Sequence, residues 1–206
     1  MNLGKFIVIE GLEGAGKSSV ISSVTALLEG RGIDSIQTRE PGGTPLAETL
    51  RSAIKQHWQE SVTIETELML MYAARSQLLE NVIMPSLKKG QWVIGDRHDL
   101  SSRAYQGGGR GVDTALIDSI RSITLKGFEP DLTLYLDVEP TVGLSRAKGR
   151  GELDRIEVSG VAFFERVREA YLGAAEADPK IKVINAMQSM DAVEEDVLSI
   201  VKEYLQ

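Results

Sequence analysis

The stretch Gly11-Leu12-Glu13-Gly14-Ala15-Gly16-Lys17-Ser18 decides the fold of this chain. It matches the pattern G-x-x-x-x-G-K-[ST], in which glycines let several backbone N–H groups converge on a polyphosphate. The lysine brings a positive charge to the outer phosphates, and the serine hydroxyl is a ligand for Mg²⁺. Since a helix begins at this point, the cradle is expected to extend to Ser19 and to use the positive end of the helix dipole. The motif therefore predicts a nucleotide-binding P-loop.

Outward from this motif, short apolar strands alternate with amphipathic helices along the chain. Strands are expected at residues 6–10, 35–38, 92–95, 132–136 and 181–184. Helices are expected at residues 18–29, 46–58, 64–87, 114–125, 141–147, 163–177 and 192–205. Thr44 and Pro45 mark the start of the second helix, and Pro85 is expected to end or bend the third.

Short, continuously apolar strands suit a parallel sheet that is covered by helices on both faces. The sequence thus predicts an α/β fold, a P-loop NTPase three-layer αβα sandwich with a central five-stranded parallel sheet. Each motif follows a strand, and ligands in such sheets bind at the carboxyl ends of the strands.

Bulk properties narrow the class of protein. A length of 206 residues suits one domain over residues 1–206. The formal net charge of −7 disfavours binding to a nucleic acid polymer. The chain has no cysteine, which fits a reducing, cytoplasmic environment. It has no apolar run of the roughly 18 residues needed for a membrane helix, and its start does not resemble a signal peptide.

Arginines recur along the chain, several of them in predicted loops after strands. A phosphate acceptor explains this pattern, because its oxygen is already largely anionic at pH 7 and needs charge neutralisation rather than a general base. The chain lacks the N-K-x-D segment of GTPase switches and is short for a transport ATPase. The pattern therefore favours a small-molecule kinase.

Further motifs carry a more specific resemblance. They are TREPGGT at residues 38–44, AAR at 73–75, GDRHD at 95–99, AYQGGGR at 104–110 and GELDRIE at 151–157. Together with the P-loop, and in the same order over nearly the whole chain, they closely resemble the bacterial thymidylate kinase family. The resemblance implies phosphorylation of dTMP by ATP with Mg²⁺, in a homodimer.

The resemblance also implies residue roles. Arg39 and Arg97 would hold the acceptor phosphate, while Tyr105 would pack against the deoxyribose and reject a 2′-hydroxyl. Asp96 resembles a Walker B acid and, with Ser18, would bind Mg²⁺. The substrate-binding residues implied are Glu10, Arg39, Arg51, Met71, Arg75, Arg97, Ser102, Tyr105 and Gln106.

The catalytic residues implied are Lys17, Arg97 and Arg150. No arginine lies inside the P-loop, so the resemblance is to the variant that places basic residues in a lid, here about residues 146–157. Arg150 would act on the transferring phosphoryl group, and Arg146 would stack on adenine.

Two positions depart from the family pattern or lack a role. The family often stacks a phenylalanine on the base where this chain has Met71, which is either a pocket residue or simply part of the core. Arg103 adds a charge beside the expected base pocket. A kinase for another pyrimidine, such as dUMP or UMP, and a non-catalytic nucleotide-binding regulator therefore stay as alternatives.

Overall fold

The computed structural model describes residues 3–149 and 154–206. Within these residues, five strands form one parallel sheet in the order β2-β3-β1-β4-β5. The strands are β1 (Phe6–Gly11), β2 (Ser35–Arg39), β3 (Trp92–Asp96), β4 (Leu132–Asp137) and β5 (Ile181–Asn185). All five predicted strands are confirmed, each one residue longer than expected.

Helices alternate with these strands. They are α1 (Lys17–Gly30), α2 (Pro45–Lys55), α3 (Ile64–Leu78), α4 (Met84–Lys88), α5 (Asp99–Ser102), α6 (Thr114–Leu125), α7 (Pro140–Lys148), α8 (Val161–Ala177) and α9 (Met190–Tyr204). Two π-helical segments, η1 (Leu79–Ile83) and η2 (Arg103–Gly109), and one 3-10 turn, η3 (Glu157–Ser159), complete them. None of the helices in the described ranges is long and apolar enough to cross a membrane.

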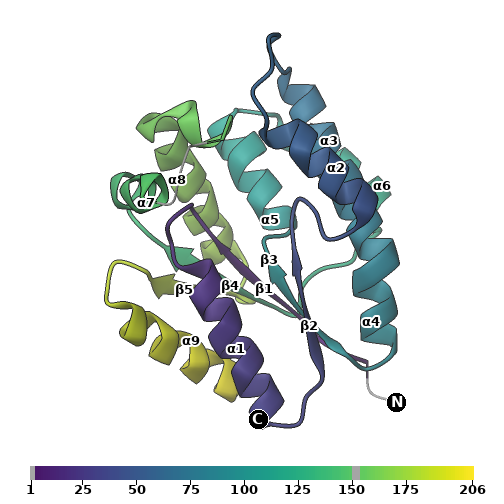
Figure 1. Ribbon diagram of the computed structural model, residues 1–206, viewed down its shortest axis with the longest axis vertical. Helices are drawn as coiled ribbons and strands as arrows, with labels where there is room; N and C mark the ends of the chain where they lie inside the picture. The colour runs from purple at the N-terminus through teal and green to yellow at the C-terminus, as the bar shows by residue number, and fades with distance from the viewer. Residues whose placement is uncertain (1–2, 150–153) are drawn as a thin grey trace.

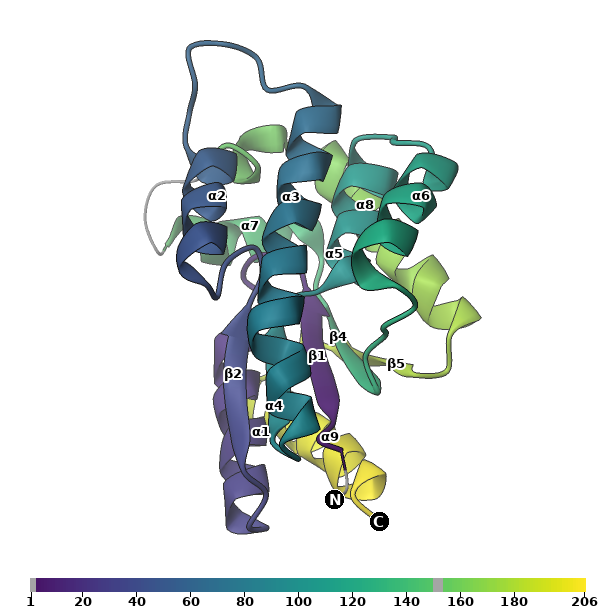
Figure 2. The ribbon, with the colours of Figure 1, turned by 90° about the vertical axis from the view of Figure 1, so that its right-hand side faces the viewer.

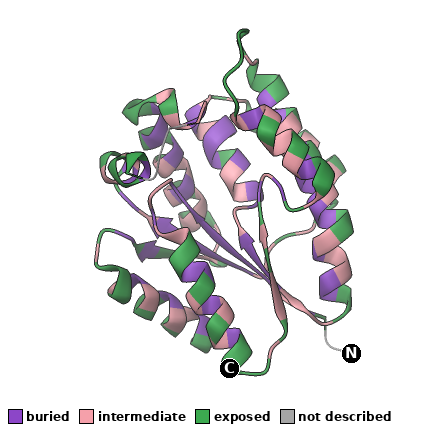
Figure 3. Cartoon of the chain, in the orientation of Figure 1, coloured by how far each residue is buried: buried purple, intermediate pink, exposed green. Residues whose placement is uncertain are grey.

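The elements form three layers. Helices α1 and α9 pack together on one face of the sheet, and α3, α4, α5 and α8 cover the other (Figure 1). Seen from the side, α2 and α3 rise above the ends of β1 and β2 (Figure 2). The predicted three-layer αβα architecture is confirmed. The central strands β1, β3 and β4 are mainly buried, whereas the edge strands β2 and β5 and the outer sides of the helices are more exposed (Figure 3).

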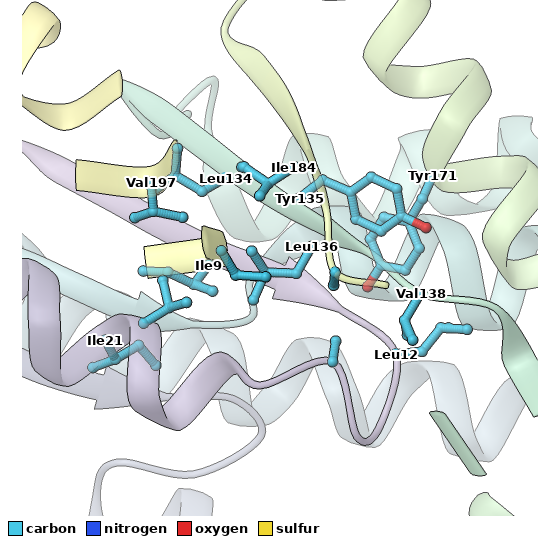
Figure 4. Packing of buried hydrophobic residues seen from close by; sticks show 14 of the residues in the cluster. Ile9, Leu12, Ile21, Leu134, Tyr135, Leu136, Val138, Tyr171, Ile184 and Val197 are labelled. Carbon is cyan, nitrogen blue, oxygen red and sulfur yellow. The ribbon is translucent and has the colours of Figure 1, made fainter. Parts of the chain in front are cut away.

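The alternation of side chains along β1 explains the two-sided core. Ile7 and Ile9 belong to the cluster that includes α1 and α9, whereas Phe6 and Val8 pack with α3, η1 and α4. Glu10 shares the second face, which places its carboxylate under α5 and α8. Figure 4 shows the main cluster, in which Ile9, Leu134 and Leu136 meet α1 and α9.

The helix predicted over residues 64–87 is interrupted rather than continuous. It changes at Leu79 to a π-helical turn, which ends at Ile83 just before Pro85. Because proline has no N–H and crowds the preceding turn, a widened turn accommodates it without ending the helix. The predicted cap is confirmed at α2, where Thr44 Oγ1 accepts from Ala47 N at 3.2 Å, but the helix ends at Lys55 rather than at residue 58.

The sequence predicts no element between residues 96 and 114, yet α5 and η2 lie there. Glycines at 107–109 have a low helix propensity, so the sequence does not predict a helix there. Their role is close packing, because a Cβ at Gly109 would lie 2.4 Å from the Phe163 ring and one at Gly108 would lie 2.6 Å from Ala170 Cβ. The segment is therefore held against α8 by tertiary contacts.

Candidate active site

Three neighbouring strands bring the predicted motifs to one edge of the sheet. In the parallel register, Asp96 at the end of β3 lies opposite Arg39 of β2 on one side and Ile9 of β1 on the other. The P-loop leaves β1 two residues later, at Gly11. Consequently the phosphate cradle, the acidic residue and the first predicted acceptor arginine meet at the edge where the strand order reverses.

The P-loop has the backbone that its glycines predict. Gly14 and Gly16 adopt φ values of 77° and 93°, and a Cβ at Gly14 would lie 2.2 Å from the Gly143 carbonyl oxygen. Lys17 Nζ lies inside the loop, where it donates to the carbonyl oxygens of Gly11 and Leu12 at 3.1 and 3.2 Å. Burial and the nearby charge of Arg97 lower the pKa of Lys17 to about 8.

A hollow beside the P-loop is the candidate donor site. Its lining consists of Gly14, Gly16, Lys17, Ser18, Ser19, Asp96 and Arg146. Arg146 Nη1 donates to the carbonyl oxygens of Ala186 at 3.2 Å and Gly14 at 3.4 Å. The structure thus places the predicted adenine-binding arginine against the phosphate loop.

A second cavity, called here the acceptor cavity, adjoins the first. It is lined by Glu13, Lys17, Arg39, Glu40, Pro41, Arg51, Ile54, Lys55, Met71, Arg75, Asp96, Arg97, His98, Ser101, Ser102, Tyr105, Gln106, Asp154, Ile156 and Glu157. Every predicted substrate-binding residue except Glu10 is among them. Lys17 and Asp96 line both cavities, so the two hollows meet at these side chains.

Arg97 lines the acceptor cavity. Its φ of 70° is unusual for a non-glycine residue and turns the side chain away from the strand. Nη2 donates to Glu13 Oε1 at 2.7 Å and to the Tyr105 hydroxyl at 3.2 Å, while Nη1 donates to Ser101 Oγ at 3.1 Å. These bonds fix the guanidinium before any ligand arrives.

Arg75 marks the other end of the cavity and is itself buried. Nε donates to Glu40 Oε2 at 2.7 Å, and Nη2 donates to the His98 carbonyl oxygen and to Ser102 Oγ, both at 3.0 Å. Burial alone would raise the pKa of Glu40, but Arg75 and His98 outweigh it and hold that pKa below its usual value. Nη1 of Arg75 and Oε1 of Gln106 are buried and hydrogen-bonded to nothing in the part of the chain that the structure describes.

The predicted phosphate-binding arginines lie between these ends. Arg39 pairs with Glu48 at 2.9 Å, and its side chain is 55% exposed. Arg51 Nη1 donates to the Pro41 carbonyl oxygen at 2.8 Å. Pro41 itself follows a cis peptide bond from Glu40. Both line the cavity together with Arg75 and Arg97, which gives it four guanidinium groups among the described residues.

Asp96 fits the predicted role at a metal ion. Its Oδ1 is buried and accepts no hydrogen bond from residues 3–149 or 154–206. No group of three or more carboxylate or histidine side chains suited to a metal ion occurs in those ranges. A single carboxylate beside a serine hydroxyl suits Mg²⁺, which usually keeps several waters and binds substrate phosphates.

Two sequence-based expectations need correction. Glu10 does not reach the cavity: it is fully buried and accepts hydrogen bonds from the backbone of His98 and the hydroxyls of Ser101 and Tyr171. Burial raises the pKa of Glu10. Arg103 does not lie beside the base pocket, because η2 turns its exposed side chain outward to a separate hollow.

Met71 is both a core residue and a pocket residue. It is partly buried, packs against the main core and also lines the acceptor cavity. The thioether therefore stands where the family pattern expects an aromatic ring, between the core and the space for a base.

Arg150 lies outside the described residues, as do residues 151–153 of the predicted lid. The described end of that segment lies against α2: Lys55 Nζ is 2.5 Å from Asp154 Oδ2, and Arg155 Nε donates to the Ile54 carbonyl oxygen at 3.0 Å. Asp154, Ile156 and Glu157 consequently cover one side of the acceptor cavity.

Sequence reasoning missed part of the site. Glu13 was expected only as a member of the phosphate cradle, yet its carboxylate lies in the acceptor cavity. The sequence alone also indicates no role for three other residues that line this cavity, Glu40, Lys55 and Ser101. The acidic residue in the TREPGGT motif could have indicated this role. A buried arginine such as Arg75 requires a carboxylate partner, and Glu40 is that partner.

Sequence comparison with known proteins identifies one family. A sequence model of the family described as thymidylate kinase matches residues 9–197. The thymidylate kinases of Alteromonas mediterranea, Idiomarina loihiensis and Colwellia psychrerythraea are 62%, 60% and 61% identical to this chain. The matches cover 98%, 98% and 96% of this chain and 91%, 98% and 93% of those proteins.

Proposed function

The chain belongs to the thymidylate kinase family, and we propose that it transfers the terminal phosphoryl group of ATP to dTMP, giving ADP and dTDP. It works as one kinase domain over residues 1–206. The observation that carries the proposal is the meeting of the two cavities at Lys17 and Asp96. A donor phosphate at the P-loop and an acceptor phosphate beside Arg97 would then face each other across these two residues.

Charge neutralisation is the main task of this site. The acceptor oxygen is already anionic, so transfer needs two anions brought in line rather than a base. Arg39, Arg51 and Arg97 supply the acceptor side, and Lys17 supplies the donor side. Their positive charges lower the repulsion between the two phosphates. The net charge of −7 does not prevent this, because a small ligand responds to the charges near it rather than to those of the whole chain.

Asp96 and Ser18 would hold Mg²⁺ at the donor phosphates. Bound there, the ion would neutralise charge on the phosphate oxygens. The buried, unpaired oxygen of Asp96 supports this assignment. Asp96 and Lys17 line both cavities, so the carboxylate that would bind Mg²⁺ lies close to the lysine.

The base end of the cavity suits a pyrimidine with an imide edge. Arg75 offers donors, Ser102 offers a hydroxyl and Gln106 offers an amide oxygen. Thymine presents a carbonyl acceptor beside an N–H donor, which matches these groups. Tyr105, fixed by Glu13 and Arg97, occupies the sugar side and would oppose a 2′-hydroxyl.

Arg150 and Arg146 complete the donor side of the proposal. Arg146 contacts the P-loop carbonyl oxygen of Gly14 and would lie on the adenine ring. Arg150, two residues past the end of α7, would act on the transferring phosphoryl group. An arginine in that role contributes roughly 10³–10⁵ in rate.

The deciding experiment measures ADP release with ATP and Mg²⁺ against dTMP, dUMP, UMP, CMP, AMP, GMP and no acceptor. We expect a strong preference for dTMP. Equal or better turnover of another monophosphate would keep the kinase and overturn the acceptor. Release that needs no acceptor would favour the regulatory alternative.

The homodimer expected from the sequence is also a proposal. Helices α3 and α6 lie side by side (Figure 2), and Met69, Leu116 and Ile123 on their outer sides are 57%, 43% and 73% exposed. Such a joined apolar face suits a second copy of the chain. Sedimentation of Ile123→Asp, compared with Ile123→Val, tests this: only the aspartate should give monomers. The cytoplasmic location remains a prediction.

A further inference from the structure

Glu67, in the first turn of α3, is a buried carboxylate held by three side chains. Gln106 Nε2 donates to its Oε1 at 2.9 Å, and Arg155 Nη2 lies 2.7 Å from its Oε2. Arg110 Nε is more distant, 3.4 Å from Oε1. Burial acts to raise the pKa of Glu67, but the Gln106 hydrogen bond and the two arginines outweigh it and lower that pKa. Glu67 is therefore ionised: it accepts hydrogen bonds from Gln106 and Arg110 and forms an ion pair with Arg155.

This carboxylate fixes which way the Gln106 amide points. An ionised carboxylate has no hydrogen to donate, so the Gln106 atom at 2.9 Å must be the nitrogen. The amide oxygen, Oε1, then lies on the opposite side of the amide group. It is buried and has no donor among the described residues. Since Gln106 lines the acceptor cavity, a ligand there that reaches this oxygen would supply its missing donor.

An unpaired acceptor in that position discriminates between bases. The N3 position of thymine or uracil carries a hydrogen and can donate to the amide oxygen. The N3 position of cytosine is an acceptor, so it would leave two buried acceptors facing each other. A site that is built to hydrogen-bond one ligand strongly disfavours a ligand that leaves its buried groups unpaired.

The same carboxylate also reaches the segment that covers the cavity. Arg155 pairs with Glu67 while its backbone N–H donates to the Lys55 carbonyl oxygen at 3.2 Å. Its neighbours Asp154 and Ile156 line the cavity. Glu67 thus joins two walls of the acceptor site without lining it.

We propose that Glu67 is a positioning residue for acceptor specificity: it holds the Gln106 amide with its oxygen toward the base and, through Arg155, holds residues 154–157 along the same cavity. The inference rests on the proposed phosphorylation of dTMP. It adds to that function a residue that touches neither substrate.

The test compares kcat and KM for dTMP and dCMP in Glu67→Gln and in Glu65→Gln. Glutamine can donate as well as accept, so it no longer dictates the orientation of Gln106. We expect the dTMP-to-dCMP ratio of kcat/KM to fall roughly tenfold or more. The loss should appear in the KM for dTMP, with little change in kcat. Glu65 is exposed in the same helical turn, and its variant should behave as the parent enzyme.

A double variant separates positioning from general damage. If Glu67 acts through Gln106, Glu67→Gln combined with Gln106→Leu should show the same ratio as Gln106→Leu alone, whereas additive losses would overturn the inference. A ratio that Gln106→Leu lowers but Glu67→Gln leaves unchanged would also overturn it. Should Glu67→Gln fail to fold, Glu67→Asp keeps the charge with a shorter reach and should lower the ratio too. A parent enzyme that does not turn over dTMP would instead contradict the proposed function.

Discussion

The carboxylate of Glu13, a residue of the P-loop, lies 2.7 Å from Nη2 of Arg97. Its second oxygen accepts from the Tyr105 hydroxyl, also at 2.7 Å. The loop whose backbone cradles the donor phosphates therefore fixes, with one side chain, the arginine proposed to hold the acceptor phosphate. The positions of the donor phosphates and of the acceptor arginine therefore both depend on the P-loop.

We expect Glu13→Gln to weaken acceptor use selectively. The substitution keeps the shape of the side chain but removes the charge that orients Arg97. The KM for dTMP should rise about 10- to 100-fold, a loss of about 1.4–2.8 kcal/mol of binding free energy. The KM for ATP should change little, because the P-loop backbone is unaltered. Steady-state kinetics with each substrate varied in turn measures both constants, and an equal rise in the two would contradict the assignment.

Lys17 predicts how activity depends on pH. Its pKa of about 8 means that the free enzyme loses this positive charge as the pH rises through 8. The value of kcat/KM for ATP, which reports the free enzyme, should therefore fall above about pH 8. In Lys17→Arg, whose guanidinium stays charged, this fall should disappear even if the rate is lower. A fall that persists in Lys17→Arg would assign the ionisation to another group.

The same shift has a consequence for stability. The folded pKa of Lys17 lies below its ordinary value of 10.5, so between these values the unfolded chain binds more protons. The contribution of Lys17 to the free energy of unfolding should accordingly increase with pH from about 8 to 10.5.

Two carboxylates near the TREPGGT motif should differ sharply in their effect on stability. The ion pair of Glu40 with Arg75 has side chains 4% and 2% exposed, whereas the pair of Glu48 with Arg39 is 39% and 55% exposed. Glu40→Gln leaves the buried Arg75 with only the more distant Asp99 carboxylate, at 3.8 Å, and should cost about 3–5 kcal/mol of unfolding free energy. Glu48→Gln should cost about 0–1 kcal/mol.

Urea unfolding at neutral pH measures this difference, and similar costs in both variants would refute it. The pH dependence gives a second check. Because the folded pKa of Glu40 is lowered, its contribution is complete above about pH 4.5, its ordinary value, and is lost as the pH falls below it. The Glu40→Gln variant should lack this part of the acid-induced loss of stability.

The fold and most of the site could be predicted because they depend on local patterns. The P-loop glycines, the apolar strands and the Thr44–Pro45 helix start each act within a few residues. Parallel pairing then forces the carboxyl ends together, so Arg39, Asp96 and the P-loop were predictable as neighbours.

The rest depends on contacts between distant segments, which no local pattern reveals. Glycines at 107–109 read as a loop, yet they permit the close approach of η2 to α8. Glu10 is an acidic residue beside the P-loop, yet the side-chain alternation of β1 turns it into the interior, 2.8 Å from the Tyr171 hydroxyl. The direction of Glu13 depends on Arg97, which is 84 residues away.

Met71 allows the base pocket to be tested by restoring an aromatic ring. It lines the acceptor cavity on the same helix as Arg75, one turn before it. In Met71→Phe, stacking on thymine should contribute about 0.5–1.5 kcal/mol and lower the KM for dTMP roughly 2- to 10-fold. Met71→Ala should raise that KM, because it removes the thioether contact and leaves a gap. Met187→Phe, at an exposed position between β5 and α9, is the control and should leave the KM unchanged. Kinetics with dTMP and dUMP checks these outcomes. A KM that rises in Met71→Phe while the protein stays folded would mean that the methionine is fitted to the base, and that the family's aromatic ring has no room in this pocket.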